Sequence, residues 1–258
     1  MYLKRMNQFT HKRVFADIPI YSYEIVSSTQ EIAKVWLESQ QNNAKSVANQ
    51  AQEGQIVGVF VADHQFAGKG RRDRIWNSKS GSSLLCTYII KNGRSAPWLK
   101  IARLMVSYVQ VLNNLSVETF LKWPNDIVDE SGKKLGGCLT EIEGDFLLVG
   151  VGINMDSDAY PDELERSACS LENFGVQIDS ESYIDSVIET YLKMTAVLEG
   201  YKALSHTIGK QIEIEQISQR VSGRAIDIDQ DGSLLLEVQE GETQKIFEGD
   251  IIHARIKY

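Results

Sequence analysis

Apolar residues recur at helical spacing in three parts of the chain. The first covers residues 28–39, where Ser28 is suited to cap the first turn. The second covers residues 97–115 and begins with a proline, which is favoured in a first turn. The third covers residues 183–201. We therefore expect three helices, preceded by a short lead-in over residues 1–18.

Shorter runs rich in β-branched and aromatic residues lie between these helical stretches. Continuous apolar runs of this kind are typical of buried strands. They occur at residues 56–62, 84–90, 117–122, 138–143 and 146–153. The last two flank a Gly-Asp pair, which predicts a hairpin. The mixture of strands and helices indicates an α+β, or mixed α/β, fold for this part of the chain.

The helical period ends after about residue 206. Residues 207–258 carry short apolar runs that are broken by glycines, among them Gly223. The runs lie at residues 212–215, 225–228 and 234–238. Such a pattern predicts a small all-β domain. We therefore expect one domain over residues 1–206 and a second over residues 207–258.

The composition excludes several classes of protein. The 258 residues carry a formal net charge of -8, which argues against general affinity for nucleic acid, because that affinity needs a basic surface. The three cysteines are far apart in sequence, so neither a disulfide framework nor a structural zinc site is expected. No apolar run is long enough to span a membrane, and the first residues lack an apolar signal segment. We expect a cytoplasmic protein that has no membrane segment.

A cluster of cations interrupts this acidic background. Residues 65–76 read Gln-Phe-Ala-Gly-Lys-Gly-Arg-Arg-Asp-Arg-Ile-Trp and directly follow a predicted strand. The cations are Lys69, Arg71, Arg72 and Arg74. Guanidinium groups bind carboxylate or phosphate oxygens in a bidentate manner, and glycine lets backbone amides approach an anion closely. The segment therefore predicts a loop that binds a phosphorylated ligand.

A second polar segment, Lys122-Trp123-Pro124-Asn125-Asp126, follows another predicted strand. Loops at strand ends commonly carry function, and this one combines a cation, an amide and a carboxylate. A carboxylate beside bound phosphates suits Mg²⁺, which prefers oxygen ligands. An ordinary turn, in which the asparagine and aspartate cap their own backbone, explains the same composition. The residues alone do not separate the two interpretations.

Two segments that contain glycine complete the candidates. Lys134 precedes a Gly-Gly pair and can reach a cleft at close range, although a solvated hairpin lysine is the alternative. Residues 150–154, Gly-Val-Gly-Ile-Asn, end an apolar run and permit close approach of a ligand or of backbone. No complete G-x-G-x-x-G fingerprint or P-loop motif occurs. We interpret Cys138 as a core residue rather than a nucleophile, because no histidine lies near it in sequence.

The segment Ser27-Ser28-Thr29-Gln30 also has two interpretations. It is typical of a helix N-cap. Its hydroxyl and amide groups can equally hydrogen-bond a small polar head group. The four histidines show no ligand spacing, so we expect no histidine metal site.

Taken together, these segments resemble those of biotin protein ligases. Their order is Ser-Ser-Thr-Gln, Gln-x-Ala-Gly-Lys-Gly-Arg-Arg-x-Arg-x-Trp, Lys-Trp-Pro-Asn-Asp, Lys-Leu-Gly-Gly-x-Leu-x-Glu and Gly-x-Gly-Ile-Asn. The similarity covers roughly residues 22–258. It implies a central mixed sheet flanked by helices, as in ligases related to class II aminoacyl-tRNA synthetases, followed by a small SH3-like β barrel.

The resemblance also implies a two-step reaction. Biotin and ATP give biotinyl-5′-AMP and pyrophosphate in the presence of Mg²⁺. The ε-amine of a lysine on a biotin carboxyl carrier domain, of acetyl-CoA carboxylase or a similar enzyme, then attacks the mixed anhydride. Members occur as monomers and as homodimers. Only about 20 residues precede the first motif, so we expect no N-terminal DNA-binding domain and no DNA partner.

Position by position, the resemblance assigns roles to fourteen residues. The biotin site would comprise Ser28, Thr29, Gln30, Gln65, Lys69, Gly70, Arg71 and Lys134. The ATP site would comprise Arg71, Arg74, Trp76, Lys122, Asn125 and Asn154. Arg71, Lys134 and Asp126 would act in catalysis, with Asp126 also a Mg²⁺ ligand. Cations suit this chemistry, because the biotin carboxylate and ATP are both negatively charged.

Three positions depart from the usual family pattern. Lys69 stands where arginine is more common, Asp73 where glycine is usual, and Gln30 where asparagine is usual. A lysine keeps the charge but loses the bidentate geometry of arginine. Two rival functions remain: a lipoate ligase of the same fold and a non-catalytic regulator that binds biotin or its adenylate. The Arg-Arg-x-x-Gly-Gly-Gly pattern of lipoate ligases is absent, and the retained charged residues speak against a regulator.

Overall fold

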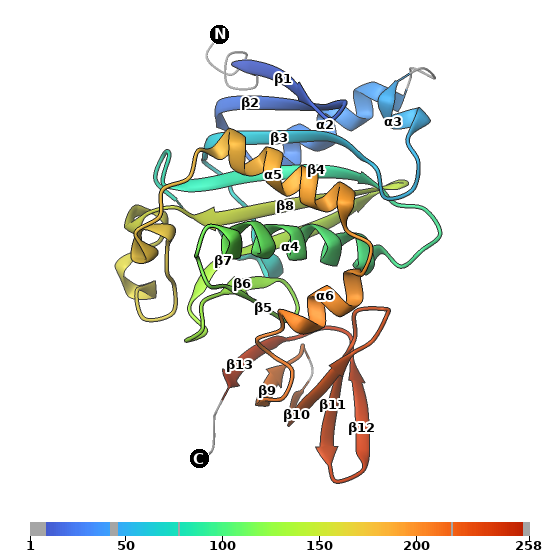
Figure 1. The fold of residues 1–258 in the computed structure, drawn as a ribbon, viewed down its shortest axis with the longest axis vertical. Coiled ribbons are helices and arrows are strands. Elements are labelled where there is room, and N and C mark those ends of the chain that lie inside the picture. The colour runs from blue at the N-terminus through green and yellow to red at the C-terminus, as the bar shows by residue number, and fades with distance from the viewer. Residues whose placement is uncertain (1–8, 42–45, 77, 218, 255–258) are drawn as a thin grey trace.

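The structure is a computed structural model, which describes residues 9–41, 46–76, 78–217 and 219–254. Figure 1 shows a large sheet with helices on both faces, and below it a small sheet built from the C-terminal segment. Both the mixed strand-and-helix part and the all-β part that the hydrophobic pattern predicts are therefore present. None of the helices in the described residues is long and apolar enough to cross a membrane.

The large sheet is mixed. Its eight strands lie in the order β1, β2, β3, β4, β8, β7, β6, β5. Their bounds are β1 (His11–Phe15), β2 (Ile18–Val26), β3 (Ile56–Gln65), β4 (Ser83–Lys91), β5 (Phe120–Lys122), β6 (Asp126–Val128), β7 (Lys134–Glu143) and β8 (Phe146–Asn154). β2 and β3 are parallel, and the other neighbouring pairs are antiparallel. The central strands are nearly continuous apolar runs, because both of their faces are covered.

Helices bury the two faces of this sheet in separate clusters. The bounds are α2 (Thr29–Gln41), α3 (Val47–Gln50), α4 (Pro97–Asn114), α5 (Ser180–Lys193) and α6 (Val197–Ala203). Phe60 of β3 packs in the cluster that contains Leu37 of α2. Val59, its neighbour on the strand, packs in the cluster that contains Tyr108 of α4 and Ile188 of α5. Successive strand residues point to opposite faces, so α2 and the α4–α5 pair cover opposite sides of the sheet.

Most of the predicted elements are confirmed. The helices expected over residues 28–39 and 97–115 are α2 and α4. Ser28 does cap α2, because its Oγ accepts a hydrogen bond from the Gln30 backbone amide at 3.2 Å. The strands expected over 56–62 and 84–90 are β3 and β4, and those over 138–143 and 146–153 are β7 and β8, paired across the predicted turn.

The predicted lead-in over residues 1–18 is wrong where the structure describes it. His11–Phe15 form β1 and pair with β2 across a turn in which Ala16 and Asp17 have φ angles of 48° and 63°. Hairpin turns with two positive φ angles usually contain glycine or asparagine. The two turn residues here are neither glycine nor asparagine, so the local sequence does not indicate a hairpin. Residues 1–8 lie outside the described part of the chain.

The single helix expected over residues 183–201 is wrong as well. The chain forms α5 and α6 instead, with extended backbone at Met194. Arg103 of α4 donates a hydrogen bond from Nη2 to the Met194 carbonyl at 2.7 Å. This contact occupies a carbonyl that a continuous helix would use for its own hydrogen bond.

The strand expected over residues 117–122 begins only at Phe120. The backbone amide of Thr119 donates to the Asn113 side chain at 2.9 Å, so it is not available to a neighbouring strand. The end of α4, rather than the sheet, therefore decides where β5 starts.

The C-terminal segment forms a five-stranded antiparallel sheet in the order β12, β11, β10, β9, β13. Its strands are β9 (Gln211–Glu215), β10 (Arg220–Ile228), β11 (Leu234–Gln239), β12 (Glu242–Ile246) and β13 (Asp250–Ala254). The predicted runs are β9, β10 and β11, whereas β12 and β13 were missed. Gly223 lies inside β10 and does not break it as expected. A Cβ there would lie 2.4 Å from the Glu237 carbonyl oxygen, so the glycine permits close packing of β10 on β11.

The two sheets meet at a buried junction. Trp123 is 1% exposed and donates from Nε1 to the Gly232 carbonyl at 2.9 Å. Trp98 of α4 lies against Gly232, and Lys202 of α6 pairs with Asp227 of β10 at 2.8 Å. One hydrophobic cluster extends from α4 into the small sheet. Packing and polar contacts therefore both fix the small sheet on the larger part.

We expect Gly232→Ala to destabilise the protein by about 1–3 kcal/mol more than Gly209→Ala does. The two glycines have φ angles of +86° and +87°, so the backbone cost of alanine is the same at both. A Cβ at position 232 would lie 2.2 Å from the Trp98 ring, whereas no atom of the residues that the structure describes lies within 4 Å of one at position 209. Chemical denaturation of both variants measures the difference. Equal free energies of unfolding would contradict a tight junction.

Candidate active site

A cavity of about 650 Å³ opens beside the start of α2, next to the small sheet. Its walls come from the start of α2, the β3–β4 loop, the β5–β6 turn, strands β7 and β8, and the start of β13. All fourteen residues that the sequence singles out line it: Ser28, Thr29, Gln30, Gln65, Lys69, Gly70, Arg71, Arg74, Trp76, Lys122, Asn125, Asp126, Lys134 and Asn154. The fold therefore brings five motifs that are far apart in sequence to one place.

Glycines form the floor of the cavity. Gly150 and Gly152 are two residues apart on β8 and so face the same side, and Gly137 of β7 pairs with Gly152. A Cβ at position 150 would lie 2.6 Å from Gln30 Oε1, and one at position 152 would lie 2.6 Å from the Trp76 ring. The close approach expected at this strand is made by two of the protein's own side chains, Gln30 and Trp76.

The start of α2 forms a polar end of the cavity. Gln65, the last residue of β3, accepts hydrogen bonds from the backbone amide and the hydroxyl of Thr29 at 2.7 and 3.0 Å. Thr87 of β4 donates to the Thr29 hydroxyl at 2.8 Å and to Gln30 Oε1 at 3.4 Å. The Gln30 Nε2 atom is buried and has no hydrogen-bond partner among the described residues. Because an unpaired buried donor is costly, this amide is suited to a ligand that accepts a hydrogen bond.

Lys134 reaches the floor of the cavity from the start of β7. Its Nζ lies 2.6 Å from Asp126 Oδ1 and 5.7 Å from the centre of the Trp76 ring. It is therefore an ion-paired cavity residue and not a solvated hairpin lysine. Trp76 Nε1 is also buried, and no group in the described part of the chain accepts a hydrogen bond from it. An ammonium group and an indole N–H are thus both available to an anionic ligand here.

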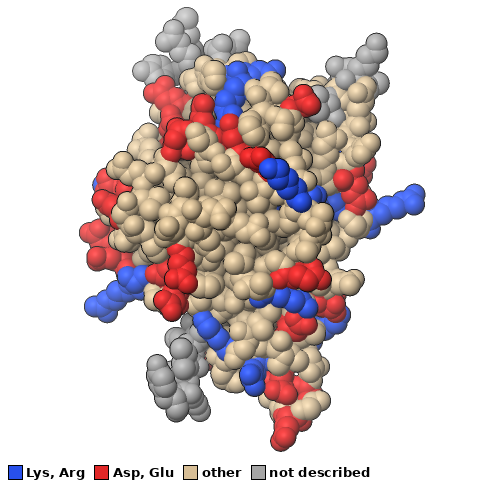
Figure 2. All heavy atoms as spheres, viewed as in Figure 1, with Lys and Arg blue, Asp and Glu red and all other residues tan. Residues whose placement is uncertain are grey.

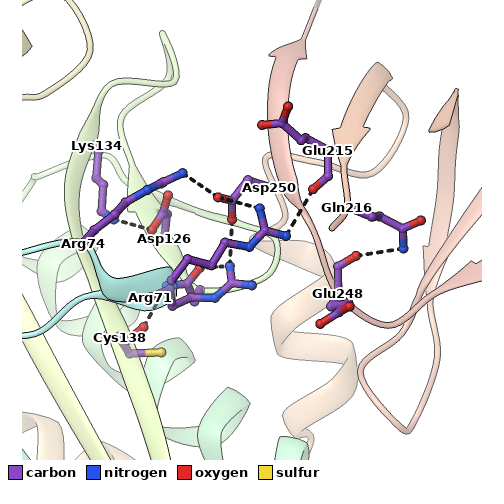
Figure 3. Close-up of polar contacts among 11 residues, drawn as sticks. Arg71, Arg74, Asp126, Lys134, Cys138, Glu215, Gln216, Glu248 and Asp250 are labelled. Atoms are coloured by element: carbon purple, nitrogen blue, oxygen red, sulfur yellow. Dashed lines mark hydrogen bonds and ion pairs between the residues drawn. The ribbon is translucent and has the colours of Figure 1, made fainter. Parts of the chain in front are cut away.

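Three arginines of the β3–β4 loop converge on one carboxylate of the small sheet (Figure 3). Arg71 Nη1 lies 3.2 Å from Asp250 Oδ1, and Arg72 Nη1 and Arg74 Nη2 lie 3.4 and 2.7 Å from Asp250 Oδ2. Arg71 Nη1 also donates to Asn125 Oδ1 at 3.0 Å. Positive charge is therefore concentrated at the mouth of the cavity.

Lys69 ties the same loop to α2. Its ammonium group pairs with the Glu31 carboxylate in the first turn of the helix, and this hydrogen bond raises the pKa of Lys69. The loop is thus held on one side by the helix that forms the polar end and on the other by the small sheet. The side chain of Asp73 lies outside the described part of the structure.

Two asparagines of the candidate set bind the protein's own backbone. Asn154 is 4% exposed, and its Nδ2 donates to the carbonyls of Cys169 and Lys134 at 2.9 and 3.3 Å. Asn125 Nδ2 donates to the Cys138 carbonyl at 2.7 Å. These contacts join the walls of the cavity to one another. Asn154 in particular acts as a brace between the segment before η4 (Leu171–Phe174) and β7.

The Cys138 thiol belongs to the core, as the sequence indicates. The residue is 6% exposed, and burial raises the pKa of its thiol to about 12. A thiol with this pKa stays protonated near neutral pH and is a poor nucleophile.

Sequence reasoning missed two polar groups at this site. Thr87 lies in an otherwise apolar strand, and only its place opposite the start of α2 shows that it contacts Thr29. Asp250 lies in a segment where no element was predicted, and the pairing of β13 with β9 places it above the loop. Residues 159–168, which contain the short 3-10 helix η3 (Asp162–Leu164), add a further wall. None of these features has a local sequence signal.

The concentration of cations at the cavity differs from the surface in Figure 2. Among the described residues on that face, Lys and Arg side chains are scattered between Asp and Glu side chains. On this face acidic and basic side chains are thus interspersed, whereas Arg71, Arg72 and Arg74 are gathered in one loop.

The fold and the site define a two-part protein with a cavity beside a cationic loop that is suited to a small anionic ligand. The model of the biotin/lipoate A/B protein ligase family matches residues 24–158, and that of the biotin protein ligase C terminal domain matches residues 207–254. The chain therefore belongs to the biotin/lipoate A/B protein ligase family. The resemblance that the five motifs indicate is confirmed.

Several known proteins are similar over most of the chain. The bifunctional ligase/repressor BirA of Bacillus spizizenii is 33% identical over 250 residues, which are 88% of this chain and 72% of that protein. The biotin–[acetyl-CoA-carboxylase] ligase of Mycobacterium tuberculosis is 32% identical over 231 residues, which are 83% and 85% of the two chains. A biotin protein ligase from Aquifex aeolicus, solved with biotin and ATP, has the same fold, with a TM-score of 0.72 at 24% identity over 90% of this chain and 97% of that one.

We expect all three cysteines to resist alkylation in the folded protein. They are buried and free, and burial raises the pKa of each thiol to about 12. Iodoacetamide at pH 8 should therefore label the folded protein at least about a hundredfold more slowly than the protein unfolded in guanidinium. Intact-mass measurement over time gives both rates. Rapid labelling of Cys138 in the folded protein would show that this thiol is reactive after all.

Proposed function

We propose that the protein is an ATP-dependent biotin protein ligase. One observation carries the proposal: a single cavity joins a polar end, where the Gln30 Nε2 amide has no partner among the described residues, to a cationic part with Arg71 at the mouth and Lys134 at the floor. Biotin has the matching distribution of groups, because its uncharged ureido ring is at one end and its carboxylate is at the other. The ATP phosphates then meet the carboxylate at the cationic mouth.

In the first step a biotin carboxylate oxygen attacks the α-phosphorus of ATP, and pyrophosphate leaves with the electrons of the broken bond. Both reactants are anions, so their repulsion opposes the approach. Arg71 and Lys134 offset that repulsion and stabilise the charge that develops on phosphate oxygens. In the second step the ε-amine of a carrier lysine attacks the biotinyl carbonyl carbon. AMP leaves, and the amine loses a proton.

The other cavity residues divide between the two substrates in this proposal. Gln30 donates to the ureido carbonyl, and Ser28, Thr29 and Gln65 hold that end in shape through the contacts at the start of α2. Lys69 and Gly70 form the part of the loop that closes over the carboxylate. Arg74, Trp76, Lys122 and Asn125 face the nucleotide, and Asn154 braces the wall behind it.

Magnesium is proposed to accompany ATP. In the part of the chain that the structure describes, no three His, Cys, Asp or Glu side chains form a metal-binding cluster. This fits an ion held by phosphate oxygens and water with one protein carboxylate, which we take to be Asp126. When bound, the ion neutralises charge on the phosphates. Asp126 also pairs with Lys134, which gives this carboxylate a second proposed role: it orients the Lys134 ammonium group between turnovers.

The polar end of the cavity favours biotin over lipoate. A buried amide donor needs an acceptor, and the ureido oxygen of biotin provides one. The dithiolane ring of lipoate carries only sulfur, which is a weak acceptor. A lipoate ligand would therefore leave the Gln30 amide unpaired.

The proposed macromolecular substrate is a biotin carboxyl carrier domain. The name of the Mycobacterium tuberculosis relative specifies acetyl-CoA carboxylase as its substrate, and we extend that class to this chain.

We place the domain boundary between residues 206 and 207, supported by the family match that begins at residue 207 and by the start of β9 at Gln211. The three cysteines are free, which suits a protein of the reducing cytoplasm. We propose that the protein acts there as a monomer or a homodimer.

A transfer assay tests the proposed function. The purified protein with ATP, Mg²⁺ and a carrier domain should attach biotin, and not lipoate, to one lysine, as measured by intact mass. A carrier with that lysine changed to arginine is the control. A preference for lipoate would contradict the ligand assignment. Biotin binding without release of pyrophosphate would favour the non-catalytic regulator.

Arg71→Gly should release biotinyl-5′-AMP at least about tenfold faster than the wild-type protein, because it removes a charge-assisted hydrogen bond. We also expect the released adenylate to label lysines on bystander proteins. Release is measured in a single-turnover experiment with radiolabelled biotin. Arg94→Gly, an exposed loop substitution away from the cavity, is the matched control. Retention of adenylate equal to that of the wild-type protein would remove Arg71 from the proposed site.

A further inference from the structure

The convergence of loop arginines on Asp250 joins the two sheets at the mouth of the cavity. Figure 3 shows Arg71 and Arg74 extending from the loop toward Asp250 at the start of β13. Arg72 adds a hydrogen bond from Nη2 to the Glu215 carbonyl of β9 at 3.2 Å. One carboxylate thus faces three guanidinium groups. Without it, the three like charges would repel one another at close range.

The position of Asp250 is set by the small sheet and not by the loop. Asp250 pairs with Glu215 in the β13–β9 register. Gly249, just before it, has φ +150°, and a Cβ there would lie 2.3 Å from Ile214 Cγ2. Only glycine therefore lets β13 begin this close to β9. The Asp250 side chain is 20% exposed, so the carboxylate is a partly buried, fixed anchor.

The loop backbone is adapted to this anchor. Arg72 adopts a left-handed conformation, with φ 53° and ψ 47°. A residue with a Cβ adopts this conformation at a cost, which its surroundings must offset. The contacts of the Arg72 side chain with Asp250 and with the Glu215 carbonyl offset the cost of this backbone conformation.

The three arginines make two kinds of contact. Arg72 and Arg74 both bind Asp250 Oδ2, and neither contacts the cavity wall through these atoms. Arg71 binds Oδ1, and the same Nη1 atom also binds Asn125 Oδ1, which belongs to the cavity. Arg71 is therefore the arginine of the three that can turn from the carboxylate to a ligand while the other two stay in place.

We propose that Asp250 is a positioning residue that tethers the arginine loop to the small sheet and so retains biotinyl-5′-AMP. Arg72 and Arg74 keep their contacts with Asp250 throughout the reaction. Arg71 exchanges Asp250 for the anionic groups of biotin, ATP and then the adenylate. The small sheet thereby controls how long the intermediate stays bound. This inference rests on the proposed ligase function.

The tether predicts a specific effect of Asp250→Asn. The amide keeps the shape of the side chain but removes its charge, so the loop opens more often. The adenylate, formed on the enzyme from biotin and ATP, should escape about tenfold faster than from the wild-type protein. Wild-type release should accelerate with added salt, whereas release from the variant should depend on salt much less, because screening acts on the charge that the variant lacks. Asp250→Glu should restore slow release in large part.

Asp227→Asn is the matched control. Asp227 also pairs across the two sheets, with Lys202, but it does not contact the loop. This variant should release the adenylate at the wild-type rate. Similar thermal unfolding midpoints for the two variants would assign the difference in release to the loop and not to general loosening of the junction. Arg72 does not line the cavity, so in the Asp250→Asn background Arg72→Gln should add less release than it does in the wild-type protein, because both changes break the same contact.

The outcomes separate the tether from the ligase function. If the wild-type protein forms no biotinyl-5′-AMP, the proposed function fails and the tether fails with it. If the adenylate forms and leaves Asp250→Asn at the wild-type rate, the tether alone is overturned. Slower release from Asp250→Asn would also overturn it, because competition between Asp250 and the ligand for Arg71 would then outweigh any tethering of the loop.

Discussion

Repulsion between cations held close together is the constraint that shapes this cavity. Arg71, Arg72 and Arg74 lie in one short loop, and Lys134 lies at the floor. Two carboxylates, one from the small sheet and one from the start of β6, offset part of this positive charge. Because the cations outnumber these partners, the site keeps positive charge for a ligand that carries a carboxylate and phosphates. A chain with a net charge of -8 thus binds anions through a local arrangement and not through its overall charge.

The same constraint explains why the small sheet matters to the chemistry. Its place is fixed at the buried junction, where Trp123 donates to the Gly232 carbonyl. Trp123 comes from the motif that also supplies Asn125 and Asp126 to the cavity. One turn therefore sets both the position of the small sheet and two walls of the site. A shift of the small sheet would move the carboxylate that the loop arginines bind.

The glycines of β8 show how much of the site the sequence could predict. Gly150 and Gly152 indicated close approach at this strand, and the strand itself was predicted. That the approaching groups are Gln30 and Trp76 depends on the packing of α2 and of the loop on the sheet. The hairpin at Ala16 and the break in the helix at Met194 were beyond prediction for a related reason. Each depends on a contact or a backbone conformation that leaves no periodic pattern in the sequence.

By itself the sequence determined the two-part fold, the family and fourteen of the residues that line the cavity. These follow from hydrophobic period, from turn residues and from motifs, all of which are local properties of the chain. Only the tertiary structure decided which charges meet. Asp250 is 179 residues from Arg71, and its place above the loop follows from the pairing of β13 with β9. The energy of a charge pair depends on the distance between the two groups in space. Sequence spacing does not give that distance when one partner lies in a loop of the large part and the other in the small sheet.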